Sequence, residues 1–366
     1  MTRHKEKKGV PVAVGLSGGV DSSVAAALLR EKGYAVRGIT MQIFDGSLEL
    51  KEGHKHACYG PGELEDLEAA ESVCKKLNIP LNVIDLRTEY RQFVIDHFRS
   101  EYLAGKTPNP CIVCNRRLKF GFLIEKAKNI GADFEFFATG HYARIVKSGR
   151  RFLLKKAKDQ AKDQSYFLYA LTPEQLTRTI FPLGTHTKYE VREMARAFGL
   201  TTADRMESQD FIAGGDYSLF FGRDELKAGE IVDRNGKTLG QHQGIVQYTV
   251  GQRRGLGIAS SRPLYVVKID AANNRIVVGD KKDLSSEGLI AKDINLIAVD
   301  KIERPYQAKV KIRLNSRAVG ATVLPYKNGR LKVIFNKAQL SVTPGQHAVF
   351  YDKDTVIGGG VIQKAL

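Results

Sequence analysis

A glycine- and serine-rich segment near the start of the chain combines the residue types that bind phosphate. It reads Ser17-Gly18-Gly19-Val20-Asp21-Ser22-Ser23, after a strand-like run and before a helix-like run. Glycines let the backbone approach a phosphate, and free amides at a helix start point toward it. Hydroxyls add donors, and Asp21 is placed to hold Mg²⁺ on a pyrophosphate. The Walker spacing Gly-x-x-x-x-Gly-Lys-Ser/Thr is absent, so we expect a phosphate loop of another type.

The elements around this loop alternate between β-rich and helical patterns. Strand-like runs occupy 10–16, 34–44, 81–86 and 134–139, and helical patterns occupy 22–32, 62–77, 90–104, 116–130 and 189–198. Such alternation predicts an α/β fold, a parallel sheet with helices on both faces. We expect this phosphate-loop domain to span 1–205. In such sheets ligands bind at the carboxyl ends of the strands.

The second half of the chain has short alternating strands separated by glycine-rich turns. Expected strands are 229–232, 245–249, 264–269, 275–279, 308–314, 330–335 and 348–351. This pattern predicts a small β-rich central domain over 206–283 and a C-terminal β-barrel over 284–366.

The charge balance indicates a polyanionic partner. Lys and Arg number 57 against 40 Asp and Glu, a formal charge of +17. Between Lys147 and Lys162, seven basic residues stand against one acid, Asp159. This stretch is either an RNA-binding surface or a solvated charged face. No apolar run is long enough to span a membrane, and the N-terminal residues lack a signal-type apolar stretch, so we expect a cytoplasmic protein.

Six further segments occur in a fixed order along nearly the whole chain. They are 107–115 (TPNPCIVCN), 138–144 (ATGHYAR), 162–168 (KDQSYFL), 248–257 (YTVGQRRGLG) and the C-terminal pair 343–346 (TPGQ) and 358–362 (GGGVI). Together with the phosphate loop, these segments resemble the bacterial tRNA-specific 2-thiouridylases of the MnmA type, in the PP-loop ATP pyrophosphatase superfamily.

The resemblance implies a reaction and a set of site residues. ATP adenylates the 2-carbonyl oxygen of the wobble uridine in the anticodon region of tRNA, a sulfur nucleophile attacks that carbon, and AMP leaves. The implied ATP contacts are Gly15, Leu16, Ser17, Gly18, Gly19, Val20, Asp21, Ser22, Met41 and Gly140. The implied tRNA contacts are Asn109, Pro110, His141, Lys162, Asp163, Gln164, Arg313 and Gln346. We expect Cys114, Cys111 and Asp21 to be catalytic, although Cys111 stands where many members of the family have Asp.

The chain departs from the family at its cysteines. The family uses one cysteine in a Cys-Asn pair, Cys114 here, and a second in a downstream Ile-Cys-Phe-Ile-like segment. The matching region, 207–217, contains no cysteine. A tRNA-binding paralogue without thiolation activity, and a sulfurtransferase acting on another RNA position or substrate, are therefore alternatives.

Three remaining cysteines offer another route for sulfur. Cys111 and Cys114 form a Cys-x-x-Cys pair, and Cys58 lies in a glycine-rich loop. We expect this loop and the loop that carries Cys111 and Cys114 to face the carboxyl edge of the sheet, so that the three cysteines converge. Three thiolates with one open position suit a [4Fe–4S] cluster whose free iron carries sulfide. Zinc with His54 or His56, dithiol or persulfide chemistry at Cys111 and Cys114, and a merely packed Cys58 are the alternatives. The sulfur donor is not specified.

Overall fold

The described part of the chain, residues 9–47, 57–205, 210–212 and 216–366, divides into two units in the computed structural model. The first unit combines Met1–Phe93, Cys111–Gly215 and Asp354–Val356, and the second combines Val94–Pro110, Asp216–Lys353 and Ile357–Leu366. The division into three domains made from the sequence stays a prediction. No helix in the described ranges is long and apolar enough to cross a membrane.

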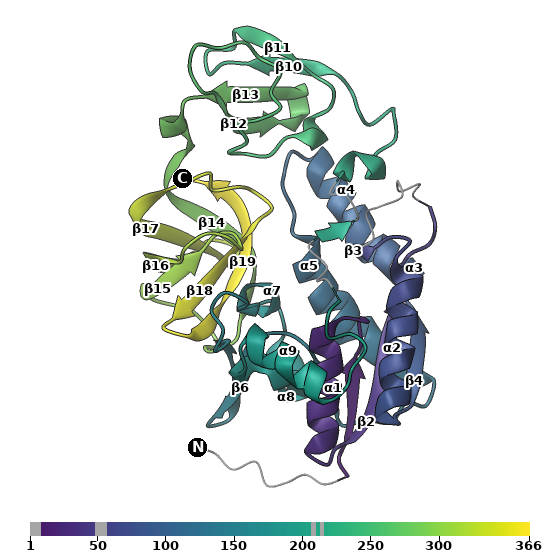
Figure 1. Ribbon diagram of the computed structural model, residues 1–366. Helices are drawn as coiled ribbons and strands as arrows, with labels where there is room; N and C mark the ends of the chain where they lie inside the picture. The colour runs from purple at the N-terminus through teal and green to yellow at the C-terminus, as the bar shows by residue number, and fades with distance from the viewer. Residues whose placement is uncertain (1–8, 48–56, 206–209, 213–215) are drawn as a thin grey trace. The chain divides into compact units, whose positions relative to one another are not determined.

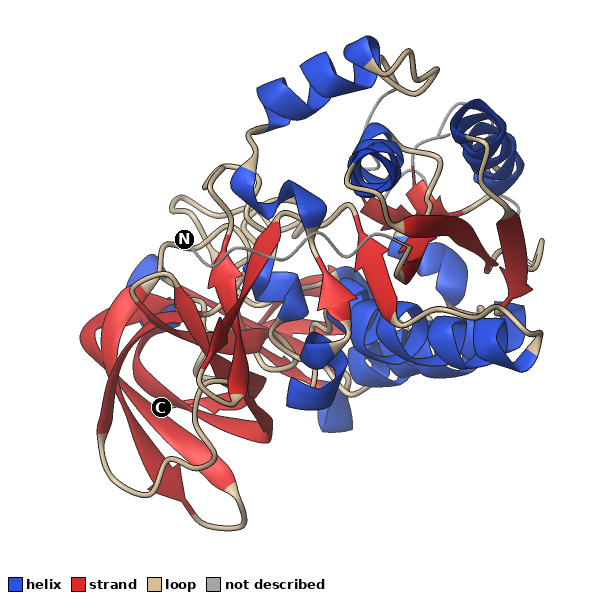
Figure 2. Ribbon diagram, turned by 90° about the horizontal axis from the view of Figure 1, so that it is seen from below, coloured by secondary structure: helices blue, strands red, loops and turns tan. Residues whose placement is uncertain are grey.

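A five-stranded parallel sheet forms the centre of the first unit. Its order is β4 (Leu81–Asp85), β2 (Ala35–Gln42), β1 (Pro11–Gly15), β5 (Phe136–Thr139) and β8 (Thr179–Ile180). Val12, Ala13 and Val14 of β1 are completely buried, because helices lie on both sides of these strands (Figure 2). The predicted α/β architecture is confirmed.

One side of the sheet packs against α1 (Val20–Glu31), α2 (Glu63–Leu77) and α9 (Lys188–Ala197). Cys74 of α2 is 3% exposed and belongs to this core. On the other side, Phe120 packs edge-on against Phe137 of β5, with ring centroids 5.5 Å apart.

The segment around Cys111 and Cys114 is helical, so their predicted position in a loop is wrong. Helix α5 (Pro110–Val113) leads into the π-helical stretch η2 (Cys114–Phe122) and then into α6 (Leu123–Asn129). Pro110 stands at the first helical position, where its missing N–H costs nothing and its fixed φ suits a helix. A second π-helical turn, η1 (Arg91–Ile95), follows α3 (Arg87–Tyr90).

The second unit contains a mixed four-stranded sheet in the order β11 (Thr238–His242), β10 (Gly229–Val232), β13 (Arg275–Gly279) and β12 (Tyr265–Asp270). The strand predicted over 245–249 is wrong, because Ile245–Gln247 form a 3-10 turn, η6. Ile245 and Val246 are both buried, whereas a strand would send successive side chains to opposite faces.

The last six strands close into a barrel (Figure 1). They run in the order β14 (Ser285–Leu296), β17 (Arg330–Leu340), β16 (Val319–Tyr326), β15 (Tyr306–Lys311), β18 (His347–Asp352) and β19 (Thr355–Ala365), and β14 also pairs with β19. Inward side chains such as Val310, Val323 and Val333 are completely buried. The predicted C-terminal barrel is confirmed.

A hairpin of β6 (Ala143–Ser148) and β7 (Arg151–Lys156) carries much of the basic stretch. Arg144 and Lys155 both pair with Asp354, at 2.8 and 3.1 Å. Lys158 pairs with Glu190 at 2.9 Å. Several of these cations therefore have carboxylate partners within the first unit.

Candidate functional site

A cavity of about 220 Å³ opens at the carboxyl ends of β1, β2 and β5. Predicted contact residues gather in its lining, namely Gly15, Leu16, Ser17, Ser22, Met41, Gly140, His141 and Gln164. Cys58 lines the same cavity, as do residues that the sequence analysis missed, Glu63, Asp66, Lys119 and Thr139. The residues predicted to contact the nucleotide thus share one pocket with a thiol, at the sheet edge where ligands bind in such folds.

The phosphate loop is held open by its own hydroxyls. Ser22 Oγ accepts from the Ser17 amide at 3.2 Å and donates to the Gly19 carbonyl at 3.1 Å. No side chain caps the start of α1 at Gly19, which leaves first-turn amides available for an anion. Gly18 has φ +70°, and a Cβ there would lie 2.5 Å from the Asp66 carbonyl oxygen. Arg205 fixes this turn by donating to the Gly18 carbonyl at 2.7 Å.

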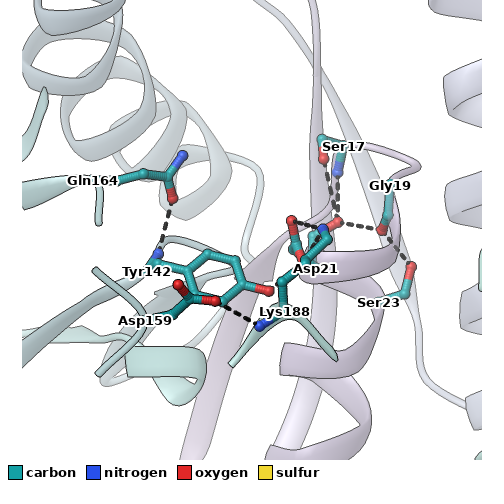
Figure 3. Close-up of polar contacts among 9 residues, drawn as sticks. Ser17, Gly19, Asp21, Ser23, Tyr142, Asp159, Gln164 and Lys188 are labelled. Carbon is teal, nitrogen blue, oxygen red and sulfur yellow. Dashed lines mark hydrogen bonds and ion pairs between the residues drawn. The ribbon is translucent and has the colours of Figure 1, made fainter. Parts of the chain in front are cut away.

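Asp21 points into a polar cluster at the start of α1 (Figure 3). Its carboxylate is paired with the Lys188 ammonium, with Nζ 2.7 and 2.8 Å from the two oxygens, and it accepts from the Tyr142 hydroxyl at 2.8 Å. The Lys188 amide in turn donates to Asp159 at 3.0 Å. Lys188 is nearly buried, at the first position of α9. The sequence analysis missed it because it lies 167 positions from Asp21.

The loop after β5 forms the opposite wall of the pocket. A Cβ on Gly140 would lie 2.6 Å from the Asp21 carbonyl carbon and the Ser22 amide, so only glycine lets this loop pack on the start of α1. His141 Nδ1 is 2.7 Å from the Thr139 hydroxyl. Burial, with a further contribution from the Lys119 charge, holds the pKa of His141 well below its usual value, so the ring is neutral. Gln164 accepts from the Tyr142 amide at 2.9 Å.

The three cysteines predicted to act together differ in exposure. Cys58 is exposed on the short strand β3 (Ala57–Tyr59), Cys111 is half-buried, and Cys114 is buried. Burial raises the pKa of the Cys114 thiol to about 11, with Lys119 acting against the rise and Cys58 adding to it. Burial raises the pKa of Tyr90 well above normal, and all three cysteines raise it further.

The charge of Lys119 interacts with all three cysteines. Burial would lower the pKa of Lys119, but Cys114, Cys58 and Cys111 outweigh that effect and the pKa is raised. The structure therefore brings the three predicted cysteines around one pocket ammonium.

These side chains do not form a ready metal site. Within the ranges that the structure describes, no group of three or more His, Cys, Asp or Glu side chains is arranged to hold a metal ion. His54 and His56, the alternative zinc ligands, lie outside the described residues. The present donor geometry thus does not fit the predicted cluster.

Strand β3 has an informative neighbour. It pairs in parallel with β9 (Asp210–Ile212), Ala57 opposite Asp210 and Tyr59 opposite Ile212. This strand belongs to the region, 207–217, in which the resemblance places the second cysteine of the family. Cys58 therefore stands on the strand that pairs with the described part of this region.

Several residues that are predicted to contact tRNA form hydrogen bonds within the protein. Asp163 accepts from the Ala157 amide at 3.0 Å and from the Ser165 hydroxyl at 2.8 Å. Arg313 donates to the Ser341 carbonyl. Gln346 donates to the Thr107 carbonyl at 3.0 Å, two residues before Asn109, so these two predicted contacts lie in one locality of the second unit. The Lys162 amide, next to Asp163 in the chain, donates to the Asp159 carbonyl at 3.2 Å.

A parallel α/β unit with an uncapped phosphate loop and a thiol in its ligand pocket defines a nucleotide-binding protein of the PP-loop class. Three family models match the chain in succession, described as a tRNA methyl transferase HUP domain over 10–213, a tRNA methyl transferase PRC-barrel domain over 223–280 and an aminomethyltransferase beta-barrel domain over 286–362.

Similar proteins agree over nearly the full length. A tRNA-specific 2-thiouridylase MnmA of Acetivibrio thermocellus is 47% identical over 362 residues, which cover 96% of this chain and 99% of the relative. One from Clostridium perfringens is 45% identical over 360 residues, covering 97% and 99%. The chain belongs to the tRNA-specific 2-thiouridylase family.

Proposed function

We propose that this protein is a tRNA-uridine 2-sulfurtransferase that adenylates the 2-carbonyl oxygen of the wobble uridine and replaces that oxygen with sulfur. The observation that carries the proposal is the single pocket in which the phosphate loop and Cys58 meet. Adenylation is required because a uracil carbonyl oxygen is a very poor leaving group.

ATP is placed with its phosphates at the uncapped amides of α1, and Gly140 and Met41 line the remainder of the pocket. Mg²⁺ would accompany the pyrophosphate and neutralise its charge. Both Asp21 oxygens already contact Lys188, so we assign Asp21 the anchoring of the loop. The same pair would have to open for Asp21 to bind the metal.

For sulfur we propose a persulfide route through Cys58, Cys111 and Cys114. A donor persulfide places sulfane sulfur on one cysteine, and that terminal sulfur attacks C2 as AMP leaves. A second cysteine then attacks the protein sulfur, the S–S bond breaks, and 2-thiouridine is released. The two cysteines are left as a disulfide, which a thiol reductant must reduce. Placement of Cys58 beside the 207–217 region supports its use as one of the pair.

A [4Fe–4S] cluster on the same cysteines is the second proposal for sulfur, and we derive no step through it. Iron and acid-labile sulfide in protein purified without oxygen separate the two routes. The persulfide route predicts activity without stoichiometric iron, and activity that rises and falls with iron content would favour the cluster.

Thiolation of an unmodified tRNA with uridine at the wobble position tests the function. With ATP, Mg²⁺ and a persulfide donor, AMP, pyrophosphate and 2-thiouridine should form in equal amounts. A tRNA with cytidine at that position is the control. Binding of the uridine tRNA without AMP or 2-thiouridine would instead identify a tRNA-binding paralogue without thiolation activity.

RNA binding should depend on the exposed end of the β6–β7 hairpin. Lys155 and Lys158 are paired within the first unit, whereas Lys147 and Arg150 are exposed. We expect the double change Lys147→Glu and Arg150→Glu to reduce the salt-dependence slope of tRNA binding by about 1–2. The control Lys301→Glu with Lys327→Glu makes the same charge change on the second unit. Equal slopes for both double variants would remove the hairpin from the RNA-binding surface.

A further inference from the structure

The π-helical form of η2 decides which side chains follow Cys114 on the same face. In an α-helix, with 3.6 residues per turn, a residue five positions on is rotated by about 140°. In a π-helix the hydrogen bonds join residues five apart, so residue i+5 lies closer to the face of residue i than it does in an α-helix. Lys119 is five positions after Cys114, and η2 spans Cys114–Phe122. The π-helical turn thus places the lysine nearer to the face of the cysteine than an α-helix would.

Lys119 is also a pocket residue. It lines the cavity together with Cys58, Thr139 and His141. Lys119 is half-buried, and among the described residues its ammonium has no carboxylate within ion-pair distance. Cys58 on β3 and the neutral His141 ring line the cavity with it, and the thiols of Cys58, Cys111 on α5 and Cys114 raise its pKa.

We infer that Lys119 is a positioning residue for sulfur, whose ammonium binds the anionic sulfur that these cysteines form and present. The inference rests on the proposed sulfurtransferase function and names a residue for its sulfur step. A thiolate or persulfide anion is stabilised by a fixed positive charge beside it. Lys119 supplies that charge without a competing carboxylate. The lysines of α6, Lys126 and Lys128, cannot supply it, because neither lines the pocket.

Persulfide loading isolates this role from the rest of the reaction. In loading, a cysteine thiolate attacks the sulfane sulfur of glutathione persulfide, a protein persulfide forms, and glutathione thiolate leaves. The rate for each cysteine is measured by mass spectrometry for the wild type, Lys119→Met, Lys119→Arg and the control Lys128→Met. Lys128 is exposed on α6 and lies over the Phe134 ring, so the control removes a lysine outside the pocket.

We expect Lys119→Met to load about 10- to 100-fold more slowly, as the loss of one charge-assisted interaction predicts. Lys119→Arg should restore most of the rate, and Lys128→Met should match the wild type. ATP-dependent and tRNA-dependent pyrophosphate release should fall less than the loading rate in Lys119→Met, and it should match the wild type in Lys128→Met.

Two results would overturn the inference. One is wild-type loading in Lys119→Met. The other is an equal loss of loading and pyrophosphate release in both Lys119 variants, which would indicate a merely structural lysine. A wild-type protein that released no pyrophosphate with tRNA would refute the proposed function, while the loading rates would still decide the role of Lys119.

Discussion

Asp21→Ala should nearly abolish the release of AMP and pyrophosphate and should also destabilise the first unit. The carboxylate holds Lys188 and Tyr142 against the start of α1, directly behind the phosphate loop. Without it, the donors of the loop lose their fixed position, and we expect turnover to fall by about 100- to 1,000-fold. The free energy of unfolding should fall by about 2–3 kcal/mol, less than for a fully buried pair, because Asp21 is 29% exposed.

A second substitution separates these two effects. Lys188→Met added to Asp21→Ala also removes the cation that Asp21 neutralises, so it should recover part of the lost stability but none of the activity. Urea unfolding and a pyrophosphate-release assay measure the two quantities. Normal turnover by Asp21→Ala would refute the assignment of this segment as the phosphate loop.

Cys58→Ser should stop thiolation while leaving adenylation intact. Cys58 is exposed in the pocket, and its hydroxyl replacement neither carries sulfane sulfur nor forms a disulfide. We expect tRNA-dependent pyrophosphate release within twofold of the wild type, with 2-thiouridine below about 1% of the wild-type yield because no second step replaces a missing covalent carrier. Mass spectrometry of nucleosides from the tRNA measures the product.

The control is Cys74→Ala. Cys74 is 3% exposed in the core, and burial, with Glu71 adding to it, raises the pKa of its thiol to about 11, so it is inert as a nucleophile. This change should cost about 1 kcal/mol of stability and no thiolation. Full thiolation by Cys58→Ser would leave the chemistry to Cys111 and Cys114 alone.

Periodicity in the sequence was sufficient to predict the parallel sheet and the barrel, because one apolar face repeats through several turns or strands of each. It failed where packing is local and irregular. The turn at Ile245 buries two neighbouring side chains, and η2 changes its hydrogen-bond pattern at Cys114 without any proline or glycine at that point. These local conformations depend on tertiary contacts, which the periodicity of apolar residues does not reveal.

For the site, the sequence identified residues within recognisable motifs and missed their distant partners. The phosphate loop and the three cysteines were found from residue type and spacing. Lys188 and Arg205 reach the loop from 167 and 187 positions away, and no local pattern distinguishes them from surface cations. Only the folded chain shows that these two are paired with functional groups.

The first unit includes Asp354, whose carboxylate pairs with two cations of the β6–β7 hairpin but is synthesised much later than the hairpin. Arg144 and Lys155 precede it by 210 and 199 positions. At about 5–20 residues per second, a ribosome needs about 10–40 s to travel from the hairpin to this residue. The nascent hairpin therefore carries these two cations without the Asp354 carboxylate until that residue has been synthesised. A chain truncated before residue 354 would contain every strand of the parallel sheet, but Arg144 and Lys155 would lack the Asp354 carboxylate.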